Sequence, residues 1–85
     1  MKLENFDQAS DIVNKIIAKE RGISAIQSCG FIAFTTNSGS HRMEISLQVA
    51  GDNVRYHNMG IELRDNILQE MESEIVELKK ELEAL

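Results

Sequence analysis

The last 25 residues of the chain carry an apolar repeat that restricts the possible folds more than any other feature. The stretch from Ile61 to Leu85 contains neither Gly nor Pro and is rich in good helix formers. Its apolar residues recur every 3.5 positions, interrupted only by Arg64, which is typical of helices that wind around one another. We therefore expect a helix over about residues 59–85, packed as in a coiled coil. The repeat consists of Ile61, Leu68, Met71, Ile75, Leu78, Leu82 and Leu85.

This apolar stripe needs a partner, either the first helix of the same chain or a second copy of the chain. A single domain of 85 residues buries only about 60–65% of its unfolded surface, so its stability alone is marginal. We expect a homodimer or larger homo-oligomer that uses the seven residues of the repeat as its interface. In a parallel pair Glu74 of one chain would face Lys79 of the other, and an antiparallel pair is also compatible with the packing.

A first helix is indicated before the middle of the chain. Apolar residues from Phe6 to Ile17 recur at helical spacing on one face. Gly22 is compatible with a C-terminal cap, since it follows a basic turn, but the apolar register continues through Ile23 and Ile26. We therefore expect a helix over about residues 6–28, in which Gly22 is a weak point that costs about 1 kcal/mol relative to Ala.

The middle of the chain predicts a β-hairpin over about residues 31–49. Residues 31–36 are rich in aromatic and β-branched side chains, and the turn formers of 37–40 follow them. Residues 41–49 then alternate, so that Met43, Ile45, Leu47 and Val49 share one face.

Residues 50–58 are expected to form a loop or a short strand before the last helix. Val54–His57 is compatible with a third strand or with irregular chain, and Asn58 is a plausible cap for the helix. The fold class is therefore α+β, with the order helix, strand, strand, helix in a single domain over residues 1–85. We expect the following residues to be buried: Ile12, Ile16, Ile26, Phe31, Phe34, Ile45, Leu47, Leu68, Met71, Ile75 and Leu78.

The chain resembles small uncharacterised proteins encoded by tailed phages and prophages. The resemblance lies in the helix–hairpin–helix layout and in an acidic last helix with the stretches Glu62-Leu63-Arg64 and Leu78 to Leu85. It implies a phage accessory protein and transfers no functional residue.

Charge is distributed unevenly along the chain. The formal net charge is −5, and the last helix supplies the whole excess, with eight acids against Arg64, Lys79 and Lys80. An acidic helix repels phosphate and anionic lipid, so we expect neither nucleic acid nor a membrane as partner. No stretch approaches the ~20 apolar residues of a membrane span. Glu4 and Asp7 precede any apolar run, so the sequence does not resemble a signal peptide. We expect a cytoplasmic protein, or one that acts in the cytoplasm of a host cell.

No residue set in the sequence matches a catalytic, metal or cofactor site. Cys29, His41 and His57 are the only thiol and imidazole side chains, and their spacing fits no zinc motif. Carboxylates four residues apart, such as Glu70 and Glu74, are typical of a solvated helix face rather than of an acid/base pair. We therefore expect a protein that is not an enzyme and that has no cofactor.

These observations favour a non-catalytic, homo-oligomeric interaction or assembly module with an unidentified protein partner. The alternative is an acidic mimic of nucleic acid that inhibits a DNA-binding protein. A lesser alternative is weak nucleic-acid binding through the basic and aromatic residues Arg42, Arg55, Tyr56 and His57.

Overall fold

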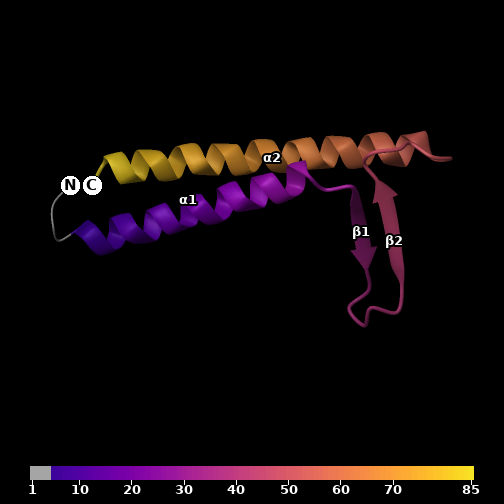
Figure 1. Cartoon of the computed structure of the whole chain (residues 1–85), viewed down its shortest axis with the longest axis horizontal. Coiled ribbons are helices and arrows are strands. Elements are labelled where there is room, and N and C mark those ends of the chain that lie inside the picture. Colours follow the sequence, from indigo (N-terminus) through magenta and orange to yellow (C-terminus); the bar gives the residue numbers. More distant parts are fainter. Residues whose placement is uncertain (1–4) are drawn as a thin grey trace. The chain divides into compact units, whose positions relative to one another are not determined.

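The computed structural model describes residues 5–85 and confirms the α+β class (Figure 1). Two long helices bracket a two-stranded antiparallel hairpin in the order α1, β1, β2, α2. The bounds are Phe6–Gln27 for α1, Phe31–Thr35 for β1, Arg42–Ser46 for β2 and Val54–Glu83 for α2.

Helix α1 runs without a break through Gly22, as the continuing apolar register predicts. A Cβ atom built on Gly22 would lie 2.8 Å from the Cε atom of Met71 on α2. The glycine therefore lies where the two helices approach each other closely, rather than at the end of α1.

Helix α2 begins five residues earlier than expected, so the interpretation of Val54–His57 as a strand or loop is wrong. The cap is Asn53, whose Oδ1 accepts a hydrogen bond from the Tyr56 amide at 3.1 Å. The Asn53 carbonyl also accepts from the His57 amide at 3.2 Å, which is the first helical bond. Asn58 lies inside the helix and does not cap it.

The hairpin pairs Phe31 with Ser46 and Thr35 with Arg42, and its second strand is shorter than the alternation suggests. The hydroxyl of Ser46 accepts hydrogen bonds from the amides of Gln48 and Val49, at 3.3 and 3.1 Å. These bonds turn the chain away from the strand direction after Leu47. Val49 is consequently exposed instead of continuing the apolar face.

The chain divides into two compact units, and α2 contributes to both. The helical unit contains α1 and the part of α2 from Ile67 onward. The hairpin unit spans Ser28–Asn66 and contains both strands and the first part of α2.

In the helical unit, α1 lies antiparallel to the C-terminal part of α2 (Figure 1). Lys19 pairs with Glu74, and the Asn5 amide donates to the Leu85 carbonyl at 3.4 Å. Ile16 on α1 and Ile75 on α2 are both buried. The first helix of the same chain thus packs along the repeat from Leu68 to Leu85, most of whose residues are half-buried. Whether the repeat also serves as an oligomer interface stays a prediction.

The expected core is confirmed in part. Ile16, Leu47 and Ile75 are buried, whereas Phe31 and Phe34 remain exposed, so their expected burial is wrong. Phe31 lies on the sheet face opposite α2, since it is paired with Ser46. Phe34 lies on the α2 side but at the open rim of a hollow. Six further expected residues are half-buried: Ile12, Ile26, Ile45, Leu68, Met71 and Leu78.

Candidate functional site

The hairpin unit presents one apolar sheet face to α2. In the register of the hairpin, Ile32 faces Ile45 and Phe34 faces Met43, so these four side chains share that face. Helix α2 approaches it at Gly60, which is buried. A Cβ atom on Gly60 would lie 3.0 Å from Ile45 Cγ2 and 3.2 Å from Leu47 Cδ2, so α2 is seated over β2.

An apolar hollow of about 270 Å³ lies beside this contact, on the side of β1. Its lining residues are Ile32, Phe34, Ile45, Met59, Gly60 and Leu63. Phe34 and Met59 are each 55% exposed and Leu63 is 43% exposed, so the hollow is incompletely filled by its own chain. We call this surface the apolar hollow.

The outer edge of β1 offers backbone hydrogen-bonding groups that the hairpin does not use. The Leu47 amide donates to the Gly30 carbonyl at 3.0 Å, and the Thr36 amide donates to the His41 carbonyl at 3.0 Å. Hydrogen-bonded pairs alternate in an antiparallel ladder, so the even-numbered residues 30, 32, 34 and 36 bond to β2. The N–H and C=O groups of Phe31, Ala33 and Thr35 therefore point away from β2. We call these groups the β1 edge.

Within residues 5–85 no strand pairs with the β1 edge. The Cys29 thiol donates a hydrogen bond to the Phe31 carbonyl on this edge at 2.7 Å. A thiol is a weak donor, and a carbonyl oxygen has two lone pairs. The edge thus keeps its capacity to bond another strand.

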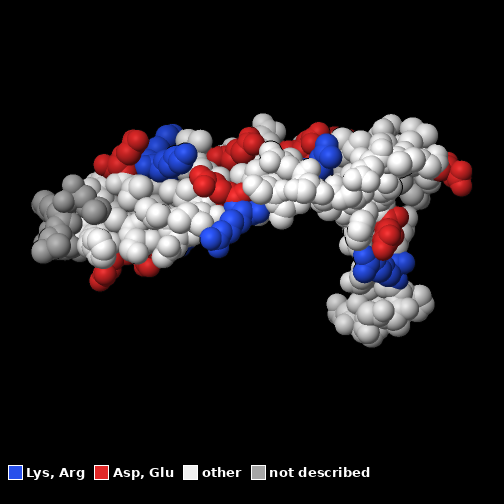
Figure 2. Space-filling model, in the orientation of Figure 1, with Lys and Arg blue, Asp and Glu red and all other residues white. Residues whose placement is uncertain are grey.

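The outer edge of β2 differs from the β1 edge, because its strand carries charged side chains and a side chain of α2 binds one of its carbonyl groups. Arg42 and Glu44 form an ion pair at 2.9 Å. Figure 2 shows both positive and negative charge on the hairpin. At the other end of the strand, His57 Nδ1–H donates to the Ser46 carbonyl at 2.8 Å. Charges and a covering side chain are the usual means by which proteins block strand edges.

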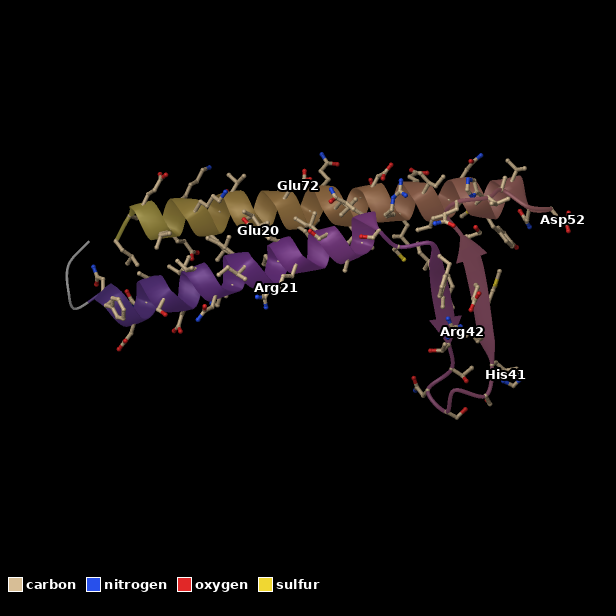
Figure 3. The ribbon with its side chains drawn as sticks, in the orientation of Figure 1. Glu20, Arg21, His41, Arg42, Asp52 and Glu72 are labelled. Atoms are coloured by element: carbon tan, nitrogen blue, oxygen red, sulfur yellow. The ribbon has the colours of Figure 1, made fainter. Side chains whose placement is uncertain are left out.

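The predicted basic and aromatic cluster is brought together in part: Tyr56 and His57 line one hollow beside Ser46, and Arg42 is not among the residues that line it. Arg42 starts β2 near the hairpin turn, and its guanidinium lies 5.4 Å from the centre of the Phe31 ring. His57 bonds to the carbonyl of Ser46, the cross-strand partner of Phe31. In Figure 3, His41 and Arg42 likewise lie at the far end of the hairpin unit from Asp52, just before α2. Nucleic-acid binding by these residues stays a prediction.

The thiol and imidazole groups are also dispersed. Cys29 follows α1, His41 contacts the Ser40 hydroxyl at 3.1 Å, and His57 is engaged by Ser46. In the described part of the chain, no three His, Cys, Asp or Glu side chains are close enough to hold a metal ion.

The acidic face of α2 in the helical unit lies beside basic residues of α1. A groove there is lined by Lys15 and Lys19 together with Glu70, Glu74 and Glu77. Lys19 pairs with Glu74, and Lys80 lies 3.6 Å from Glu77. The acids of this face are thus interleaved with lysines.

Comparisons with protein-family models, with curated proteins and with solved structures find no match for this chain. Within residues 5–85, neither helix is long and apolar enough to cross a membrane.

The β1 edge and the apolar hollow were not anticipated from the sequence. The signal for the edge was present, because residues 31–36 contain no charged residue and no Pro. No comparable feature of the sequence indicates the hollow, because it forms only when α2 begins at Val54 and approaches the sheet at Gly60.

Proposed function

We propose that the protein is a non-catalytic module that associates with itself and presents a surface for protein partners. The observation that supports this proposal is the imbalance between buried and exposed apolar residues. In the described part of the chain only Ala9, Ile16, Leu47 and Ile75 are buried hydrophobic residues, whereas thirteen large hydrophobic residues are exposed. Three of the exposed residues, Phe34, Met59 and Leu63, line the apolar hollow together, and such clustered exposed apolar side chains are typical of interaction surfaces.

The accessible surface supports the same proposal. It amounts to 6602 Å² for a chain of 9.6 kDa. A folded monomer of this mass exposes about 5,100 Å² on average. The difference, about 1,500 Å², is about twice the ~800 Å² that each partner buries in a standard protein interface. One standard interface would therefore remove about half of this excess.

The resemblance to small phage-encoded proteins suggests a biological role. In that role the self-associated protein would be a phage accessory factor that engages a host or virion protein. The apolar character of the exposed surface favours a protein partner over nucleic acid, which is bound mainly through basic residues.

The alternative function, mimicry of nucleic acid, depends on a continuous array of negative charge. The pairing of Lys19 with Glu74 and the position of Lys15 in the same groove interrupt that array on α2. These contacts support the interaction module over the mimic.

Sedimentation equilibrium of the wild-type chain tests the proposal. We expect the mass to rise from 9.6 kDa toward twice that value as concentration increases. We expect the same rise at about 0.5 M salt, because apolar contacts are not screened. A monomer mass from about 10 to 500 µM would contradict self-association.

A further inference from the structure

We propose that two copies of the chain pair antiparallel through their β1 edges, with Ala33 facing Ala33 of the partner subunit at a twofold axis. The inference rests on the self-association proposed above and names the surface that mediates it. The pairing would join the two hairpins into one four-stranded sheet.

The backbone of β1 fits this pairing without any shift in register. Phe31, Ala33 and Thr35 point their N–H and C=O groups outward, and Ala33 is the middle residue of the five-residue strand. With Ala33 at the axis, Phe31 lies opposite Thr35 of the partner subunit. Each of the three residues then donates one hydrogen bond and accepts one, and the bonded pairs are self-complementary, as a twofold interface requires.

The side chains of β1 fit the same axis. Ile32 and Phe34 lie on the α2 side of the sheet. In the joined sheet Phe34 would lie beside Ile32 of the partner subunit, in a pair without backbone bonds, where side chains approach closely. On the opposite face the small Ala33 meets its own copy, so no bulky side chain obstructs the axis.

The apolar hollow lies on the side of α2 that faces β1 rather than β2. A twofold axis perpendicular to the sheet at Ala33 keeps the α2 helices of both copies on the same sheet face. The two hollows would then face each other, and each copy would contribute Phe34, Met59 and Leu63 to the space between the helices. The residues that one chain leaves exposed at this rim would thereby cover one another.

The charge pattern identifies a second copy as the occupant. Strand β1 has the sequence Phe-Ile-Ala-Phe-Thr and carries no charge, so its antiparallel copy meets no like-charge repulsion. The β2 edge carries Arg42 and Glu44 and is partly covered by His57, so it does not compete. An uncharged edge without Pro is a ready template for strand pairing, and every copy of the chain carries the complementary strand.

Charge reversal at the axis provides a specific test. Ala33 is exposed, so a charged side chain is tolerated in the monomer. One variant is Ala33→Lys. The other is Ala33→Glu combined with Glu44→Gln, because Glu44 is the cross-strand neighbour of Ala33. Each variant alone places like charges opposite each other at the axis, and we expect its self-association to weaken by more than about tenfold.

Mixing the two variants is the decisive step. Lys at position 33 of one chain then faces Glu at position 33 of the other, and we expect a heterodimer to form where neither variant self-associates. Loss of fold cannot explain such recovery. Failure of the mixture to associate, with both variants folded by circular dichroism, would overturn the proposal.

Glu44→Gln alone is the matched control, since the backbone groups of residue 44 lie on the outer edge of β2, away from the proposed axis. We expect it to associate as the wild type does. If the wild-type chain is dimeric and both position-33 variants remain dimeric, the β1 pairing is wrong while self-association stands. If the wild-type chain is monomeric, self-association itself is wrong.

Discussion

Two glycines in the helices have different surroundings, and substitutions at them should have opposite effects on stability. A Cβ on Gly22 meets only the terminal methyl of Met71, the end of a flexible side chain that can move aside. Gly22→Ala should therefore raise the free energy of unfolding by about 1 kcal/mol, the gain in helix propensity. At Gly60 an added side chain would press on Ile45 and Leu47 in the packed sheet face. Gly60→Val should therefore lower the free energy of unfolding by about 1–3 kcal/mol.

Urea unfolding of both variants at one fixed protein concentration measures this difference. Gly60→Ala is a useful intermediate, since it adds one methyl group in place of three carbons. An increase in stability for Gly60→Val similar to that for Gly22→Ala would show that α2 does not lie close to β2.

At the scale of elements, the start of α2 depends on one cap. Asn53→Ala removes the acceptor for the Tyr56 amide and should cost about 0.5–2 kcal/mol. Asn58→Ala is the control, because Asn58 lies inside the helix, where Ala is the better helix former. It should leave stability unchanged or raise it slightly. The reverse ranking in thermal or urea unfolding would place the helix start at Asn58.

The elements differ in how far the sequence predicts them. The apolar register through Ile23 and Ile26 predicts α1 almost to its last residue, because periodicity outweighs one glycine. The start of α2 could not be predicted, since Val54, Tyr56 and Gly60 are poor helix formers. Tertiary contacts stabilise the helix there, namely Gly60 against Ile45 and His57 against the Ser46 carbonyl.

The candidate site was less predictable than the fold for a related reason. An apolar repeat shows that Leu68 and Ile75 need a partner, but periodicity does not distinguish α1 of the same chain from a second copy. Likewise, the composition of β1 predicts a strand without showing which face α2 covers. The exposure of Phe31 and Phe34 follows from the register with β2 and from the position of α2, and neither is a local property of the sequence.

At the scale of the whole molecule, the central claim is that a single chain buries too little apolar surface. We propose that it buries more when β1 pairs with β1 of a second copy. Covering the repeat of α2 with α1 does not complete the burial, because Phe34, Met59 and Leu63 stay exposed in the hairpin unit. The proposed pairing at the β1 edge would add backbone hydrogen bonds and would cover these residues together. Association and protection of the β1 edge should therefore occur at the same protein concentration.

Amide hydrogen exchange along β1, measured by NMR as a function of protein concentration, tests this claim most directly. The amides of Ile32 and Phe34 bond within the hairpin and should be protected at all concentrations, whereas the Glu44 amide on the β2 edge serves as an unprotected reference. At concentrations where sedimentation shows a dimer, we predict that exchange at Phe31, Ala33 and Thr35 slows by at least about tenfold relative to the monomer. Exchange at these three amides as fast in the dimer as in the monomer would contradict the account.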